Sequence, residues 1–138
     1  EGKATLNNIG TEELAHLEIV GTLVYKLVEG IPADRLKETR FASHYAEMGR
    51  AIYPTNSAGV PFTAAYFAST EDAIAAIHED LAAEQKARAT YEYLIDLAND
   101  PAVIDTLSFL RAREVVHFQR FGEVLNLLYD YHEEDCHD

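Results

Sequence analysis

The 138-residue sequence carries 24 acidic and 11 basic side chains, which give a formal net charge of −13. This length suits a single domain, and a hydrophobic content of 48% is typical of a folded chain rather than a disordered one. Such an acidic excess repels phosphate backbones, so we expect no nucleic-acid partner. No apolar run reaches the ~18 residues of a membrane span, so no membrane partner is expected either. The single cysteine, Cys136, excludes an intrachain disulfide.

The first half of the chain combines one long helical pattern with an irregular connection. The helical pattern spans about Ala4–Glu29 and ends at Gly30-Ile31-Pro32, where a glycine and a proline stop a helix. Between 33 and 69 the pattern breaks down: we expect a short helix near Asp34–Met48 and a loop over Tyr53–Pro61. A connection of this length is unusual in a compact domain and typically wraps a surface or contributes to a site.

The second half contains two further long helical patterns. The first of these starts at Ser69-Thr70-Glu71-Asp72, where hydroxyl and acidic side chains suit the positive end of a helix, and it continues to about Ala98. The next begins after a turn, with Asp100 as its cap and Pro101 in its first position, and runs to about Tyr131. No strand is predicted anywhere in the chain.

The core-facing stripe of each long helix contains an acidic residue near its middle. These stripes recur at alternating steps of three and four residues. The first and third are apolar except for one Glu-x-x-His each, Glu13 with His16 and Glu114 with His117, and the second is interrupted by Glu84. Buried charges are costly unless they are paired or bind a metal. We therefore expect these five side chains to converge inside the bundle and to form a metal site. Carboxylate and imidazole donors without a thiolate suit iron or manganese.

This layout is that of the ferritin-like dimetal bundles, which place Glu and Glu-x-x-His ligands on facing helices. We therefore predict an all-α fold, a ferritin-like four-helix bundle with three of its four long helices present and a long irregular crossover. Residues 1–138 are expected to form a single domain. The alternative is a buried acid–histidine network that sets the helix register without a metal.

Other polar and aromatic residues are weaker candidates for a site. His44 and His78 are expected to be exposed or locally bonded, and the donor-rich tail from Tyr131 to Asp138 is expected to be a solvated terminus. Most of the tyrosines are expected to be amphipathic packing residues: Tyr25, Tyr45, Tyr53, Tyr66, Tyr91 and Tyr93.

Four segments resemble, in the correct order, motifs of the manganese catalases, and most of all those of the short spore-coat-associated branch. They resemble the second-helix motif, the inter-helix loop, the third helix and the fourth helix of that family. The segments are Ile9–Glu18 (IGTEELAHLE), Gly59–Tyr66 (GVPFTAAY), Leu81–Arg88 (LAAEQKAR) and Arg111–Gly122 (RAREVVHFQRFG). The resemblance spans about residues 4 to 126.

The resemblance implies an enzyme that dismutates hydrogen peroxide to water and dioxygen at a dimanganese centre. By resemblance, Glu13 bridges the two manganese ions, His16 binds one of them, and Glu84 and His117 bind the other. Glu114 is then a catalytic residue that shuttles protons beside the bound oxygen species. Iron is the alternative metal, because it uses the same donors.

The resemblance also implies partners and a location. The family has an earlier bundle helix that supplies another carboxylate, so we expect the chain to be N-terminally truncated and that helix to come from the same or another chain. Family members form compact oligomers, commonly hexamers, which implies a homo-oligomer. The expected location is the cytoplasm, or the spore coat of a spore-forming bacterium. The alternative functions are a ferritin-like diiron oxidase or peroxidase, and a coat or shell component with a vestigial metal site.

Overall fold

The computed structural model describes residues 1–39, 45–47, 52–56, 58–67 and 71–135, with residues 45–47, 52–54 and 133–135 described by their backbone. The described chain is mainly helical, and its three long helices are α1 (Gly2–Val28), α3 (Ala73–Leu97) and α4 (Pro101–Asp135). The predicted all-α class and the three long helices are confirmed. The last helix continues four residues beyond Tyr131, where we expected it to end.

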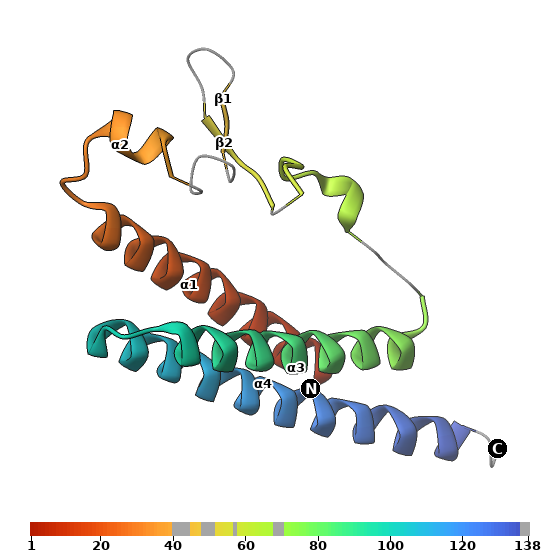
Figure 1. The fold of residues 1–138 in the computed structure, drawn as a ribbon. Helices are drawn as coiled ribbons and strands as arrows, with labels where there is room; N and C mark the ends of the chain where they lie inside the picture. Colours follow the sequence, from red (N-terminus) through yellow and green to blue (C-terminus); the bar gives the residue numbers. More distant parts are fainter. Residues whose placement is uncertain (40–44, 48–51, 57, 68–70, 136–138) are drawn as a thin grey trace. The chain divides into compact units, whose positions relative to one another are not determined.

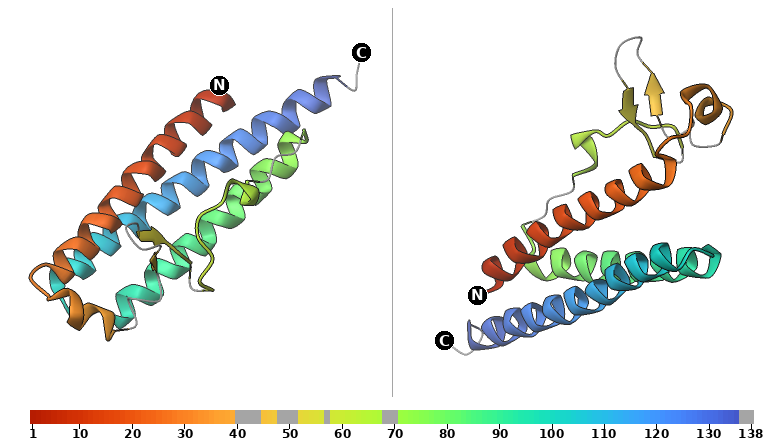
Figure 2. Two further views of the ribbon diagram at one scale, coloured as in Figure 1. Left: turned by 90° about the horizontal axis from the view of Figure 1, so that it is seen from above. Right: turned by 90° about the vertical axis from the view of Figure 1, so that its left-hand side faces the viewer.

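The chain forms two compact units, one made of Glu1–Leu23 and Ser69–Asp138 and the other of Val24–Ala68. In the first unit α3 and α4 pack against each other as an antiparallel pair, and α1 runs in the same direction as α3 (Figure 1, Figure 2). Three long helices therefore contribute side chains to this unit, which contains every residue of the predicted site.

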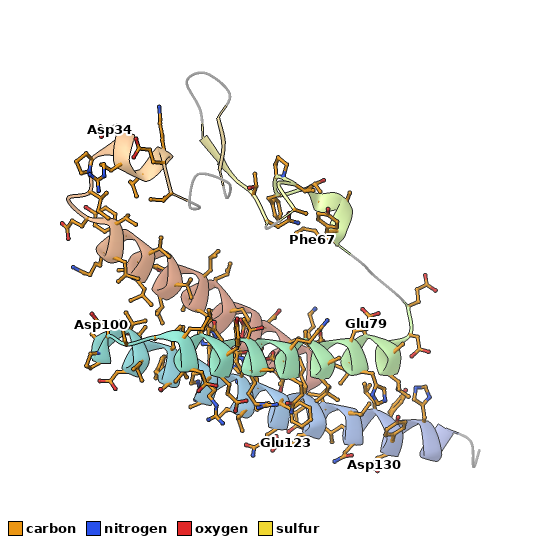
Figure 3. The ribbon with its side chains drawn as sticks, in the orientation of Figure 1. Asp34, Phe67, Glu79, Asp100, Glu123 and Asp130 are labelled. Atoms are coloured by element: carbon orange, nitrogen blue, oxygen red, sulfur yellow. The ribbon has the colours of Figure 1, made fainter. Side chains whose placement is uncertain are left out.

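Aspartate side chains start both helices of the antiparallel pair. Asp72 accepts a hydrogen bond from the Ala75 backbone N–H at 3.0 Å, so α3 begins at Ala73 rather than at the predicted Ser69, which lies outside the described residues. Asp100, labelled at the turn in Figure 3, accepts from the Ala102 N–H at 2.8 Å, and the predicted cap is confirmed. Each carboxylate satisfies a free N–H and lies at the positive end of its helix.

The second unit corrects two predictions for the irregular connection. Its elements are α2 (Ala33–Lys37), β1 (Tyr45–Glu47), β2 (Ile52–Pro54) and the 3-10 turn η2 (Ala64–Tyr66). Of the helix expected over Asp34–Met48, the described residues show only α2, which ends at Lys37, and Tyr45–Glu47 form a strand instead; residues 40–44 and 48 lie outside the described residues. The prediction of no strand is also wrong, because β1 and β2 pair in antiparallel register. Strand formation depends on a pairing partner more than on local composition, so the sequence pattern did not indicate it.

The apolar core of the first unit lies beside the middle of its helices. Ile9, Ile77, Phe121 and Val124 form a buried cluster, and steps of three and four residues connect them to Glu13, Glu84 and Glu114 in the core-facing stripes of α1, α3 and α4. Leu6 of the predicted α1 stripe is instead 42% exposed, because this face of α1 borders an open cavity described below. None of the helices in the described residues is long and apolar enough to cross a membrane.

Candidate metal centre

The five side chains singled out by their spacing come together where α1, α3 and α4 lie closest. Four of them are buried, with exposed fractions of 5% for His16, 7% for Glu84, 2% for Glu114 and 0% for His117. Glu13, which was expected in the core, is 44% exposed because it lines the same open cavity as Leu6. The cluster therefore consists of four buried side chains and one carboxylate, that of Glu13, which is accessible to solvent.

The ring nitrogens of the two histidines face the carboxylates. Nδ1 of His117 lies 2.7 Å from Oε1 of Glu13, and Nδ1 of His16 lies 3.1 Å from Oε1 of Glu114 and 3.4 Å from Glu13. One donor atom from each of these four residues lies within 4.8 Å of all the others. The two rings are stacked, with centroids 5.3 Å apart. Two Glu-x-x-His pairs on different helices thus converge on one small volume.

The two Nδ1 atoms are buried but form no hydrogen bond. The contacts to Glu13 and Glu114 are short, yet they do not satisfy hydrogen-bond geometry, and no other group of the described residues forms a hydrogen bond with either nitrogen. A buried polar atom without a partner costs about 1–3 kcal/mol, so such atoms in a folded protein call for a physical reason. Two imidazole lone pairs directed into a group of carboxylates fit the donor set of a divalent manganese or iron ion.

The charge of the cluster is also uncompensated. Within the described chain, no lysine or arginine forms an ion pair with Glu13, Glu84 or Glu114. Burial raises the pKa of Glu84 to about 9, and its hydrogen bond with Glu114 and the negative charges of Glu114 and Glu13 add to this rise. Without a cation, the cluster therefore retains a proton at neutral pH. A divalent cation would replace that proton and balance the acids.

Glu84 lies at the edge of the group. Its Oε2 is 3.7 Å from Nδ1 of His117, and it is not among the four residues whose donor atoms lie within 4.8 Å of one another. Glu114 is part of that group, although the resemblance implies that Glu84 is a ligand and that Glu114 handles protons. The division of roles between these two acids stays a prediction.

Three further residues lie near the cluster: Glu12 and Arg113, which the sequence did not single out, and Tyr91, which was expected only to pack. Glu12 accepts hydrogen bonds from Nε2 of His117 and from Arg113, both at 2.8 Å. Burial raises the pKa of Tyr91, and the charges of Glu114, Glu13 and Glu84 raise it further. Glu12 and Arg113 are the immediate neighbours of Glu13 and Glu114 in the sequence, which is the only signal that could have singled them out.

The weaker candidates lie away from the cluster. His78 is exposed and its Nε2 lies 3.1 Å from the Tyr129 hydroxyl, in agreement with a locally bonded residue. The packing role expected for most tyrosines is wrong for Tyr25, Tyr66 and Tyr93, which are all more than 60% exposed. Tyr131 and His132 are exposed, as expected for the tail. The structure does not describe the other residues named in these predictions, which are His44, the side chains of Tyr45 and Tyr53, and residues 136–138.

A cavity of about 380 Å³ opens beside the cluster. Three acids of the cluster, Glu13, Glu84 and Glu114, lie on its wall. The remaining lining residues are Leu6, Ile9 and Gly10 of α1, Asp80, Ala83 and Ala87 of α3, and Phe121 of α4. The small side chains of glycine and alanine leave room for a small molecule or another chain segment to reach the carboxylates.

The helix arrangement and the sequence of this chain are similar to those of known proteins. A solved structure of KatB, a manganese catalase from Anabaena PCC7120, superposes with a TM-score of 0.74 at 35% identity, over 91% of this chain and 56% of that one. Protein CotJC of Bacillus subtilis is 50% identical over 123 residues, which are 89% of this chain and 65% of CotJC. A probable manganese catalase of Clostridium acetobutylicum is 38% identical over 121 residues, covering 86% of this chain and 53% of that protein.

This chain thus spans between about half and two thirds of the length of these relatives. The likeness to KatB confirms the predicted ferritin-like fold. The family model "manganese containing catalase" matches residues 1–135, which include all five side chains of the cluster. The chain belongs to the family of manganese-containing catalases.

Proposed function

We propose that the protein dismutates hydrogen peroxide to water and dioxygen at a site for two manganese ions. The observation that carries this proposal is the pair of buried Nδ1 atoms of His16 and His117, which form no hydrogen bond and face three carboxylates. Membership of the manganese catalase family supports manganese rather than another divalent cation.

Glu13, His16, Glu84 and His117 would hold the metals. Glu13 is suited to a bridging role because its Oε1 is the carboxylate oxygen nearest to Nδ1 of His117 and also lies 3.4 Å from that of His16. Manganese, when bound, supplies the two-electron redox change and the Lewis acidity that peroxide dismutation needs. The cavity beside Glu13 would admit a molecule as small as peroxide.

The chain itself would handle the protons. Glu114 is 2% exposed and hydrogen-bonds to Glu84, so the two carboxyls can share one proton next to the metal-binding nitrogens. Cleavage of the peroxide O–O bond consumes protons, and oxidation of a second peroxide releases them. A buried carboxyl that takes up and returns a proton serves both halves of the reaction.

We further propose that another helix covers the open side of the site. The cavity between α1 and α3 exposes Glu13 and Leu6, and the relatives are longer than this chain. An additional helix, from the same or another chain, would bury this face and add the terminal carboxylate that the family resemblance implies. A homo-oligomer, of hexameric size by the same resemblance, is the expected assembly.

Metal analysis combined with oxygen release tests the proposed activity. The protein should contain about two manganese ions per chain and should evolve dioxygen from hydrogen peroxide without a reductant, as the site's two-electron chemistry requires. Iron in the site and peroxide consumption that depends on a reductant would instead indicate the diiron oxidase or peroxidase.

A structural role in a spore coat is the second candidate, and the 50% identity with Protein CotJC favours it. It accords with the resemblance to the spore-coat-associated branch and with a spore-coat location. Under this candidate, Glu13→Ala leaves the assembly of the protein into its coat unchanged and the parent protein shows no oxygen release. Oxygen release by the parent that Glu13→Ala abolishes favours the catalase.

A further inference from the structure

We infer that Glu12 is a positioning residue that holds the proton of His117 on Nε2, so that Nδ1 of the same ring is free to bind a metal. The part of this inference that concerns metal binding rests on the proposed function. The Glu12 carboxylate lies on the opposite side of the His117 ring from the cluster and is not among the residues whose donor atoms group around the metal site.

Glu12 contacts the outer nitrogen of the buried ring. Its Oε2 lies 2.8 Å from Nε2 of His117, and the His117 side chain is completely buried. The inner nitrogen, Nδ1, lies 2.7 Å from Glu13. Consecutive residues of α1 therefore approach the two nitrogens of one ring on α4.

Arginines keep Glu12 in its charged form. Arg113 donates to Oε2 of Glu12 from Nε at 3.2 Å and from Nη2 at 2.8 Å, and Nη1 of Arg120 lies 3.9 Å from Oε1. A charged carboxylate can only accept hydrogen bonds, so the shared proton resides on Nε2 of His117.

This proton position determines which ring nitrogen can bind a metal. A neutral imidazole has one N–H donor and one lone pair, so an Nε2–H tautomer leaves the lone pair on Nδ1, inside the cluster. A carboxylate on the other nitrogen also orients the ring and makes the metal-binding nitrogen more basic. Arg113, Glu12 and His117 thus form a chain of hydrogen bonds that ends at the site.

His16 lacks a comparable arrangement and provides an internal control. Among the described residues, no carboxylate lies within 4.0 Å of Nε2 of His16, and its ion contacts involve Nδ1 alone. A change at Glu12 should therefore affect the His117 side of the site and leave the His16 side in place.

The test compares the unchanged full-length protein with Glu12→Ala, Glu12→Gln and Glu18→Gln. The last variant removes one acidic charge from an exposed position of α1 and serves as a matched control. The first readout is the Nε2–H proton resonance of His117 in metal-free protein labelled with ¹⁵N-histidine. It should be present in the unchanged protein and in Glu18→Gln, and lost in Glu12→Ala. Glu12→Gln retains a carbonyl acceptor and should keep the resonance.

The second readout is manganese occupancy on each side of the site, measured by anomalous diffraction at limiting manganese. Glu12→Ala should weaken binding on the His117 side by about 10- to 100-fold, with a smaller loss in Glu12→Gln and no loss on the His16 side. An unchanged Nε2–H resonance in Glu12→Ala, or equal losses on both sides, would overturn the inference. If the unchanged protein binds no manganese but the resonance behaves as expected, the proposed function fails while the positioning role of Glu12 stands.

Discussion

Two of the polar networks that connect the helices of the first unit have opposite effects on the pKa of their acidic residues. Near the outer surface, Glu92 of α3 accepts hydrogen bonds from Arg88 at 2.7 Å and from Arg111 of α4 at 2.8 Å. These bonds lower the pKa of Glu92. In the cluster of Glu13, His16, Glu84, Glu114 and His117, burial and neighbouring carboxylates instead raise the pKa of Glu84 to about 9.

This difference supports the proposal that the acid of the Glu92 network is structural and that the acids of the buried cluster bind a metal. The Glu92 network contains its own cations, so its charge is balanced by the folded chain alone. The buried cluster combines three acids with two histidine nitrogens that lack hydrogen bonds, and it includes no lysine or arginine of the described chain. The chain can lower the charge of this cluster only by retaining protons, which an added divalent cation would replace. If this contrast is correct, equivalent changes in the two networks must have very different consequences.

The largest effect is expected from Glu13→Gln, which removes the carboxylate closest to Nδ1 of His117 and keeps its shape. The variant should lose its bound manganese and its oxygen release, because a neutral amide is a poor ligand for a hard divalent cation. Glu92→Gln should keep both. Elemental analysis and an oxygen electrode measure these outcomes, and a Glu13→Gln protein with full metal content would refute the contrast.

Metal removal should have the next largest effect. A ligand present at about 100 to 1,000 times its Kd stabilises the folded state by about 2.7–4.1 kcal/mol, so stripping manganese with a chelator should lower the free energy of unfolding by about that amount. Thermal unfolding before and after chelation measures the loss, with Glu13→Gln as the control that should not respond. An identical Tm with and without metal would show that the acids are balanced in some other way.

A pH dependence of the metal-free protein should follow from Glu84. Its pKa is raised from 4.5 to about 9 in the folded state, so its contribution to stability is complete below about pH 4.5 and is lost as the pH rises towards 9. Urea unfolding of metal-free protein at pH 5, 7 and 9 should show this decline, and Glu84→Gln should make it shallower. A Glu84→Gln profile as steep as that of the unchanged protein would place the titrating group elsewhere.

The smallest effect is expected from Glu92→Ala. The Glu92 network is exposed to water, so its loss should lower Tm only slightly, and the difference should shrink in roughly 1 M salt, where the Debye length is about 3 Å. Manganese content should not change. A loss of metal in this variant would mean that the two networks are coupled, against the contrast drawn above.

The sequence was sufficient to predict the three long helices and the convergence of the two Glu-x-x-His pairs. Steps of three and four on long helices place Glu13 and His16 on one face, and the same rule holds for Glu114 and His117. The Asp100 cap and the break after α1 follow from local chemistry that does not depend on tertiary contacts.

Features that depend on how one segment of the chain contacts another were not predictable. The pairing of β1 with β2 needs a partner strand that local composition does not reveal. The proposed role of Glu12 depends on how α1 packs beside α4, because that packing brings Glu12 to His117, which is 105 positions further along the chain. Glu12 itself lies next to the core stripe of α1 rather than in it. The exposure of Glu13 likewise depends on the cavity between helices and not on its position in α1.

Anomalous diffraction from crystals of the full protein, recorded at the manganese and iron edges, tests the central claim most directly. The account predicts two manganese peaks among Glu13, His16, Glu84, Glu114 and His117, and none near Glu92. Peaks at the iron edge alone would contradict the assignment of manganese. The absence of any peak in the cluster, in protein that evolves dioxygen from peroxide, would contradict the claim that these acids and histidines form the metal centre.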